Sequence, residues 1–354
     1  MKVGVVLQGG SMRGLYSAGV LDVMMDHQIE VDGMIGVSVG ALFGPNYFSK
    51  QRGRALRYNK RMAKDLRFIS MWSFLFTGNI VSKGFAYYKM TYHIDPFDNR
   101  TFRKANKDFY ATVTNIETGK AEYLPMRGLE ENGLEILRAS AAIPFFCRVV
   151  KINGKKYLDG GVGDNVPVLK AKELGYDKII VILTQTANER KEPLSPLMMK
   201  ALQFKYPRYP LFLEALKNRH TMCNENIESI LEMEKNGDIF VFCPQDDLGV
   251  NLIERDSNKM QEVYDKGAND CINRIEELKA FLKGWLLIPF SVYLFNVSKT
   301  RLVLFMLRLA TLFKMFSPNC WTSLIATWSA TAVEPYGNFT LRLLDILLKY
   351  WSDA

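Results

Sequence analysis

One stretch near the start of the chain decides the fold that the sequence predicts: Val3-Gly4-Val5-Val6-Leu7-Gln8-Gly9-Gly10-Ser11-Met12-Arg13-Gly14. Residues 3–7 are apolar, rich in valine and followed by glycines, which indicates a short buried strand. The apolar residues over 15–26 suit a packed helix. The glycine-rich segment is therefore expected to be a loop that joins a strand to a helix.

The rest of the chain repeats this alternation as far as residue 283. Further strands are predicted at 31–37, 110–114, 121–124, 157–158, 178–183 and 239–243. Further helices are predicted at 40–48, 168–174, 213–231 and 256–282. Such alternation with short turns is typical of an α/β fold with a largely parallel central sheet. Pro45 is expected to kink the helix at 40–48, because proline has no N–H to donate.

Composition excludes several classes of protein. The chain has 354 residues, of which 48% are hydrophobic and 23% are charged, as in ordinary globular proteins. A disordered protein, a collagen-like repeat and a polytopic membrane protein are therefore excluded. The length allows two or three domains, or one large domain with an extension. The net charge of +9 favours an anionic partner, either nucleic acid or a phospholipid surface.

Signals for metal sites, disulfides and targeting are absent from the sequence. The five cysteines are scattered without a C-x-x-C pair, and the three histidines form no H-E-x-x-H motif. We therefore expect no metal, no cofactor and no disulfide framework. The first apolar run is too short for the hydrophobic region of a signal peptide. A cytoplasmic protein is expected, and the unpaired cysteines agree with a reducing compartment.

The strongest chemical signal is a G-x-S-x-G motif, Gly36-Val37-Ser38-Val39-Gly40. It lies between a predicted strand and a predicted helix, where a serine sits on a tight turn and flanking glycines prevent clashes. The N-terminus of the helix adds partial positive charge beside the serine. Ser38 is therefore the candidate nucleophile. The alternative is a glycine-rich turn with an incidental serine.

The glycine loop Gly9-Gly10-Ser11-Met12-Arg13-Gly14 is the second signal. A dinucleotide-binding loop needs G-x-G-x-x-G, and Ser11 stands where the middle glycine belongs. A Walker loop needs Gly-Lys-Ser/Thr, which the chain lacks here. The N–H groups of the loop can instead converge on a carbonyl oxygen that becomes negative during acyl transfer. A tight turn that only packs the helix on the strand is the alternative.

The third signal is Asp159-Gly160-Gly161, at the end of a predicted strand. The glycines leave backbone space beside the carboxylate. Such a carboxylate can accept the Ser38 proton directly as a general base. The alternative is an ordinary turn aspartate.

In this order the three motifs resemble the patatin-like phospholipase family, especially its bacterial members. Three further blocks are similar to that family: Thr112-Val113-Thr114-Asn115 with Thr118-Gly119, Leu137-Arg138-Ala139-Ser140-Ala141-Ala142-Ile143-Pro144, and Asn165-Val166-Pro167 with Ala171 and Leu174-Gly175. The resemblance is clear over 3–185 and loose as far as 283. It implies a three-layer α/β sandwich and a serine hydrolase that cleaves fatty-acyl esters of lipids without a metal.

The resemblance also implies roles for single residues. Ser38 falls on the nucleophile and Asp159 on the proton acceptor of a dyad without histidine. The oxyanion hole would be formed by Gly9, Gly10, Ser11, Arg13 and Val39. The motif glycines are Gly14, Gly36, Gly40, Gly160 and Gly161. Ser11 replaces a third glycine of the family, so the loop is strained if this position needs a positive φ.

Other functions fit parts of the same pattern. A lipid-binding protein of this fold that has lost turnover is suggested by Ser11. A triad esterase of Ser38, Asp159 and His220 would have the chain order of the α/β hydrolases. However, His220 lies inside the helix predicted at 213–231, where a histidine is more often a surface or packing residue. A nucleotide-binding Rossmann protein is opposed by the failed glycine fingerprint.

A basic segment followed by aromatic residues predicts contact with lipid. Residues 50–67 hold eight basic residues and one acid, and the stretch 68–76 follows them. This arrangement suits a peripheral contact with an anionic membrane surface and shallow insertion. The alternative is a solvated helix face beside core aromatics. Nucleic acid is not expected, because no binding module accompanies the patch.

The composition changes after residue 283. Residues 284–354 contain 9 charged residues, whereas residues 1–283 contain 74. Four of the five tryptophans also lie in 284–354. We therefore predict an acyl hydrolase domain at 1–283 and an apolar, Trp-rich helical extension at 284–354. The tryptophans suit an extension that contacts the membrane interface. A buried extension that packs on the body is the alternative.

Overall fold

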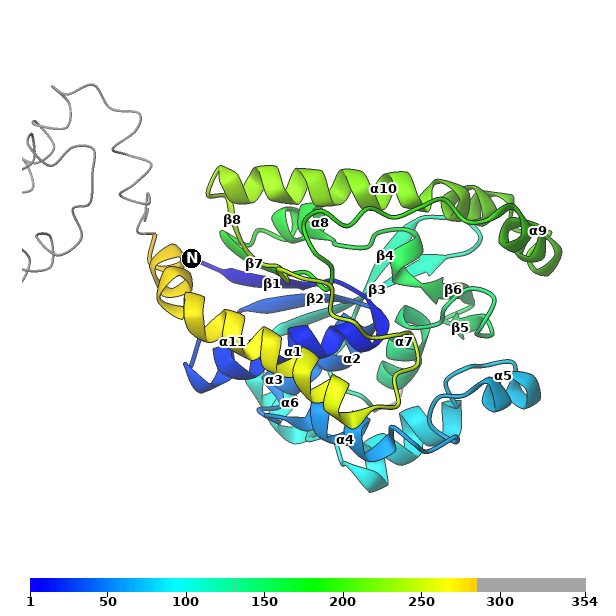
Figure 1. The fold of residues 1–354 in the computed structure, drawn as a ribbon, viewed down its shortest axis with the longest axis horizontal. Coiled ribbons are helices and arrows are strands. Elements are labelled where there is room, and N and C mark those ends of the chain that lie inside the picture. The colour runs from blue at the N-terminus through cyan, green and yellow to red at the C-terminus, as the bar shows by residue number, and fades with distance from the viewer. Residues whose placement is uncertain (131, 285–354) are drawn as a thin grey trace, which may run out of the picture. The chain divides into compact units, whose positions relative to one another are not determined.

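A mixed sheet forms the centre of the protein (Figure 1). The structure is a computed structural model that describes residues 1–130 and 132–284, so the predicted extension lies outside the described residues except for Gly284. The strands are β1 (Val3–Leu7), β2 (Gly33–Val37), β3 (Asp108–Asn115), β4 (Ala121–Pro125), β5 (Val150–Ile152), β6 (Lys155–Asp159), β7 (Lys178–Ile182) and β8 (Ile239–Phe242).

The sheet is parallel through most of its width. Its order is β5-β6-β3-β2-β1-β7-β8, and β4 also pairs with β3. From β3 to β8 along this order, neighbouring strands run parallel. The strands β4, β5 and β6 run antiparallel to their partners. The predicted, largely parallel central sheet is therefore confirmed.

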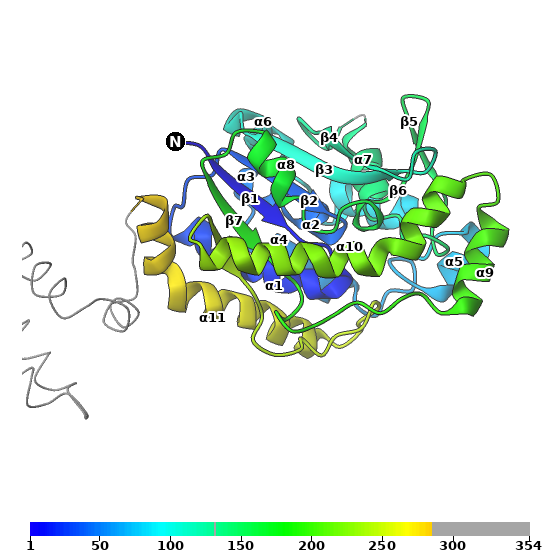
Figure 2. The same ribbon diagram turned by 90° about the horizontal axis from the view of Figure 1, so that it is seen from above.

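Helices cover both faces of this sheet. They are α1 (Gly14–Asp26), α2 (Val39–Phe43), α3 (Pro45–Phe48), α4 (Arg54–Met62), α5 (Met71–Thr77), α6 (Asn99–Ala105), α7 (Gly133–Ser140), α8 (Val168–Glu173), α9 (Pro196–Lys205), α10 (Pro210–Lys235) and α11 (Ser257–Leu282). Short 3₁₀ turns lie at Ser11–Arg13 and Gly160–Val162, and a π-helical segment spans Lys83–Ile94. In both views α8 and α10 lie on one face, and α1, α2 and α11 lie on the other (Figures 1 and 2).

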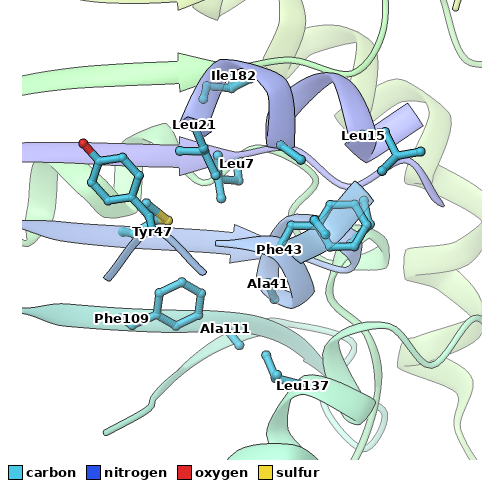
Figure 3. Close-up of a cluster of buried hydrophobic side chains, with 14 of the residues drawn as sticks. Leu7, Leu15, Leu21, Ala41, Phe43, Tyr47, Phe109, Ala111, Leu137 and Ile182 are labelled. Atoms are coloured by element: carbon cyan, nitrogen blue, oxygen red, sulfur yellow. The ribbon is translucent and has the colours of Figure 1, made fainter. Parts of the chain in front are cut away.

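Alternating side chains of the strands fill two separate cores. Leu7 and Ile182 belong to the core beneath α1 and α2, where they lie near Leu21 of α1 (Figure 3). Val6, one residue earlier on β1, belongs to the core beneath α8 and α10. Successive residues of a strand point to opposite faces, so a strand that is apolar at every position can bury both faces. The result is the predicted three-layer α/β sandwich.

Most predicted elements coincide with observed ones, and the differences have local causes. The helix predicted at 40–48 is divided into α2, which ends at Phe43, and α3, which begins at Pro45. Proline suits the first position of a helix, where its missing N–H has no partner to lose. Within the described ranges, no helix is both long and apolar enough to cross a bilayer.

Candidate active site

Ser38 lies on a sharp turn between β2 and α2. Its backbone has φ 53° and ψ −118°, a conformation that costs about 1–3 kcal/mol for a residue with a side chain. A Cβ atom on Gly40 would lie 2.7 Å from the Leu7 carbonyl oxygen, so only glycine fits there. Strained turns of this kind expose a nucleophile at the end of a strand. The glycine-flanked turn thus positions Ser38 at the end of β2, just before α2.

The strand register brings Asp159 to Ser38 from 121 positions away. Val37 on β2 pairs with Thr112 on β3, and Val113 on β3 pairs with Asp159 at the end of β6. The Ser38 hydroxyl donates a hydrogen bond of 2.7 Å to Asp159 Oδ2. The two side chains that the sequence singled out are therefore in direct contact.

The carboxylate of Asp159 is held by groups around the next turn. The N–H of Gly161 donates to Asp159 Oδ1 at 2.8 Å. Burial raises the pKa of Asp159, while the hydrogen bonds from Ser38 and Gly161 and the positive charge of Arg219 lower it. Burial is the largest of these effects, so the net pKa lies above that of an ordinary aspartate. A carboxylate with a raised pKa is a stronger base toward a neighbouring hydroxyl.

The glycine loop lies directly beside the Ser38 turn. A Cβ atom on Gly9 would be 3.1 Å from Ser38 Cβ. In the described part of the chain, no acceptor binds the backbone N–H groups of Gly9, Gly10 or Ser11. The Val39 N–H at the start of α2 is likewise without an acceptor among the described residues. These four predicted donors remain available to a ligand oxygen.

Ser11 has a positive φ, which is the condition under which strain is predicted for the loop. Its φ is 52°, in the left-handed region that favours glycine. Its hydroxyl donates a hydrogen bond of 2.7 Å to the Leu252 carbonyl. The loop is therefore strained at this residue, and the hydroxyl bond offsets part of the strain.

Arg13 holds the loop and does not point a free N–H toward the site. Its N–H donates to the Gly10 carbonyl at 3.1 Å. Its guanidinium pairs with Glu189 at 2.8 Å and with Asp247 at 3.2 Å. Within the described residues, the backbone N–H of Arg13 therefore already has an acceptor, unlike those of Gly9, Gly10 and Ser11. Its side chain ties the loop to the segments that follow β7 and β8.

The remaining motif glycines lie in tightly packed places around the site, where an added Cβ atom would meet another atom at 3.2 Å or less. Gly14 begins α1, and Gly36 lies in β2. Gly160 and Gly161 form the turn after Asp159.

Two site residues have roles that sequence reasoning missed. The Ser38 N–H donates a hydrogen bond of 2.9 Å to the hydroxyl of Ser140, at the end of α7. Arg219 on α10 donates from Nε to the Gly161 carbonyl at 2.7 Å. Ser140 stood inside a block similar to the family, but Arg219 carried no local signal. Both act across long sequence separations, which motif reading does not detect.

The ring of His220 makes local contacts. Its Nδ1 lies 3.1 Å from the Lys217 carbonyl, and its Nε2 lies 3.4 Å from the Thr221 hydroxyl. Ser38 instead bonds directly to Asp159. Among the described residues, the His220 ring therefore forms no hydrogen bond to Ser38 or Asp159.

A cavity of about 680 Å³ opens onto Ser38 and Asp159. Its walls are mainly apolar, with residues from the Ser38 turn, from α7 and from the segments around α5 and α9; they include Leu42, Leu137, Ile143, Phe146, Met198 and Leu202. This volume suits a small-molecule ligand with an apolar body. In the ranges 1–130 and 132–284, no cluster of three metal-ligating side chains is present.

The basic residues at 50–67 are less available to an anionic surface than their number indicates, because several of them form ion pairs. Arg54 is buried and pairs with Asp95, which also pairs with Arg57. Arg52 and Arg67 also pair with aspartates, Asp26 and Asp65 respectively. These ion pairs neutralise half of the eight basic residues at 50–67. In the aromatic stretch Phe68 is buried, but no residue of α5 is.

Comparison with known proteins finds a matching family model and several relatives. A family model described as patatin-like phospholipase matches residues 5–172, and a domain of unknown function (DUF6363) matches 209–283. The uncharacterized protein YjjU of Escherichia coli is 31% identical over 189 residues, which cover 52% of each chain. Lysophospholipase NTE1 of Scheffersomyces stipitis is 27% identical over 289 residues, 75% of this chain and 17% of that protein.

The aligned regions thus span about half of YjjU and less than a fifth of NTE1. A solved structure, VipD from Legionella pneumophila, aligns with a TM-score of 0.39 and 12% identity over 78% of this chain and 67% of that chain. The family match contains the glycine loop, the Ser38 turn and Asp159. Residues 5–172 therefore form a patatin-like phospholipase domain.

Proposed function

We propose that this protein is a serine acyl hydrolase that cleaves fatty-acyl ester bonds of lipids, with Ser38 as nucleophile and Asp159 as proton acceptor. The observation that carries the proposal is the 2.7 Å hydrogen bond between these side chains at a largely apolar cavity. The patatin-like phospholipase domain supports a lipid substrate. The similarity to lysophospholipase NTE1 supports a single-chain phospholipid among the candidates.

The first step forms an acyl-enzyme. Asp159 accepts the Ser38 proton while Ser38 Oγ attacks the ester carbonyl, and the carbonyl π electrons move onto oxygen. We expect the N–H groups of Gly9, Gly10, Ser11 and Val39 to hold that oxyanion. When the intermediate collapses, the ester C–O bond breaks and the leaving alcohol takes the proton from Asp159. Loss of one such donor typically lowers the rate by about 10²–10³.

The second step releases the fatty acid. Asp159 takes a proton from a water molecule, whose oxygen attacks the acyl carbonyl of the Ser38 ester. The same N–H groups stabilise the second oxyanion. Collapse returns the proton from Asp159 to Ser38 Oγ and frees the carboxylic acid. The apolar lining of the cavity provides space for the hydrocarbon chain during both steps.

A fluorophosphonate probe tests this proposal, because it reacts with activated serines. Wild-type protein should be labelled, and Ser38→Ala and Asp159→Ala should not be. A panel of monoacylglycerols, lysophospholipids and diacyl phospholipids then identifies the hydrolysed class. Folded wild-type protein that is neither labelled nor active on any of these lipids would refute the proposal.

A second candidate function is lipid binding without turnover. The strained φ of 52° at Ser11 favours it, because a distorted loop could misplace the oxyanion donors. Lipid binding together with an unreactive Ser38 would support this candidate over the hydrolase.

The hydrolase is also proposed to contact the surface of an anionic membrane through α5 and α9. Trp72 and Phe76 on α5 are 60% and 80% exposed, and Phe204 on α9 is 90% exposed. Both helices lie at the same end of the molecule in the two views (Figures 1 and 2). Lys205 joins them, with its ammonium group 5.9 Å from the ring centre of Phe74.

The position of this apolar surface supports its function. Met198 and Leu202 on α9 line the cavity, as does Phe146, which packs against Phe74 of α5. A lipid that left the membrane at α5 and α9 would therefore enter the cavity directly. Exposed aromatic side chains beside basic groups are typical of shallow insertion into anionic bilayers.

A further inference from the structure

Four basic side chains line the cavity within the described residues, and only one lacks a carboxylate partner. Arg13 and Lys191 both pair with Glu189, and Arg54 pairs with Asp95. Arg219 forms no ion pair with any described carboxylate within 4.0 Å. A cation in a largely apolar cavity is stabilised when an anion joins it there.

The guanidinium of Arg219 lies beside the proposed dyad. Its Nε is used by the Gly161 carbonyl at 2.7 Å. A methyl group built on Gly161 would lie 3.2 Å from Asp159 Oδ1 and 3.8 Å from Arg219 Nη2. Both groups therefore border the same small space. The terminal nitrogens Nη1 and Nη2 donate to no acceptor in the described part of the chain, so they remain available to a ligand.

The anchoring of Arg219 suits recognition of an anion. The hydrogen bond from Nε fixes one edge of the planar group and leaves the two terminal nitrogens for another partner. Planar guanidinium groups bind phosphate oxygens in pairs, with charge-assisted hydrogen bonds. In a glycerolipid only a few bonds separate the ester carbonyl from the phosphate. An ester carbonyl at Ser38 would therefore place the phosphate close to the dyad.

We propose that Arg219 forms a subsite for the phosphate group of a phospholipid headgroup. This proposal rests on the proposed hydrolase for its biological meaning. It also places a specificity determinant on α10, outside the family match at 5–172 and inside the second match at 209–283. The subsite selects phosphate-bearing esters over neutral esters with the same acyl chain.

Binding to a protein that cannot turn over tests the subsite separately from the hydrolase. The background is Ser38→Ala, and the probes are monomeric dodecyl phosphate and neutral 1-O-dodecylglycerol, measured by calorimetry. Arg219→Gln keeps a nitrogen at the position of Nε, because the glutamine amide lies the same number of bonds from Cα. It removes only the terminal nitrogens and the charge.

Adding Arg219→Gln should weaken the binding of dodecyl phosphate by about tenfold or more, relative to its effect on the binding of dodecylglycerol. Arg219→Lys should recover part of this loss, because the charge remains. The matched control is Arg208→Gln, which removes an exposed arginine outside the cavity lining and should leave both affinities unchanged. Equal weakening of both probes, or no weakening of dodecyl phosphate, would overturn the proposal.

Two further measurements separate related explanations. Inorganic phosphate should not displace dodecyl phosphate at comparable concentration; if it does, the site binds free phosphate and the headgroup proposal is wrong. In the protein with Ser38 intact, Arg219→Gln should lower kcat/KM for 1-palmitoyl-lysophosphatidylglycerol about tenfold more than for 1-palmitoylglycerol. An equal loss of kcat/KM on both lipids would mean that Arg219 only positions the dyad and does not bind phosphate, which would overturn the proposal. If the wild type hydrolyses neither lipid, the binding result alone decides the subsite.

Discussion

The hydroxyl of Ser11 donates a hydrogen bond of 2.7 Å to the carbonyl oxygen of Leu252, 241 positions further along the chain. This bond fastens the glycine loop to the segment between β8 and α11. It also coincides with a positive φ of 52° at Ser11. One residue therefore combines local backbone strain with a long-range contact that opposes it.

Replacing Ser11 separates these two effects. Both Ser11→Ala and Ser11→Gly lose the bond to Leu252, but only glycine adopts the positive φ without strain. We expect Ser11→Gly to be more stable to urea than Ser11→Ala by about 1 kcal/mol. Equal free energies of unfolding in the two variants would show that this position does not require a positive φ.

Removing the charge of Asp159 should stabilise the folded protein at neutral pH. Burial raises the pKa of Asp159 above its value in the unfolded chain. Between those two values the folded state binds more protons, so stability falls as pH rises through that window. Asp159→Asn avoids this cost and should have a higher Tm than wild type at neutral pH. The difference should disappear at acid pH, below the pKa of the unfolded carboxyl.

A Tm of Asp159→Asn below that of wild type at neutral pH would contradict this prediction. Hydrolysis should be abolished in the same variant, because asparagine cannot accept the Ser38 proton. Wild type, Asp159→Asn and Ser38→Ala are compared in one calorimetric series and one ester assay.

The pH profile of hydrolysis should show the raised pKa of Asp159 as its acid limb. The base must be deprotonated, so kcat/KM for a soluble neutral ester should fall as pH decreases through that pKa. The limb should lie above the ordinary aspartate value of about 4. Because the positive charge of Arg219 lowers the pKa of Asp159, Arg219→Gln should move the limb to higher pH. A limb that stays in place would mean that Arg219 does not influence the carboxylate.

Ser140 should matter to turnover more than His220 does. Ser140 is fully buried, and its hydroxyl accepts the hydrogen bond of the Ser38 N–H. Ser140→Ala leaves that N–H without a partner, at a cost of about 1–3 kcal/mol, and loosens the turn that presents the nucleophile. We expect kcat to fall by about tenfold or more.

His220→Ala is the matched control, because among the described residues the ring of His220 hydrogen-bonds only to neighbours on its own helix. It should retain most ester hydrolysis. A collapse of kcat in His220→Ala with Ser140→Ala unaffected would reverse the assignment and favour a triad.

Membrane contact should depend on the exposed aromatics of α5. Trp72→Ser and Phe76→Ser should each weaken co-sedimentation with vesicles of phosphatidylcholine and phosphatidylglycerol by about tenfold, given the apolar area lost. Leu169→Ser is the control, since Leu169 is 65% exposed and belongs to α8, a helix that lies away from α5 and α9 (Figure 1). Equal binding of all variants would exclude α5 as the contact, as would an equal loss from Leu169→Ser.

Much of the architecture could be predicted from local patterns. The apolar runs of β1 and β7 bury both faces, so their identity as central strands follows from composition alone. The glycines around Ser38 indicate the turn because no side chain fits there. The segment at 83–94 was not predicted, because its π-helical form depends on packing and not on a periodic pattern.

The sequence by itself determined which residues are candidates for the proposed chemistry: a serine on a glycine-flanked turn, an aspartate at a strand end and a glycine-rich loop. Only the tertiary structure decided that Asp159 reaches Ser38, because this depends on the register of β2, β3 and β6. It also decided that carboxylates pair with Arg13 while Arg219, on a distant helix, lies beside the dyad. The physical reason is that a hydrogen bond or an ion pair acts only over a few ångströms, and the folded path of the whole backbone determines which groups come that close.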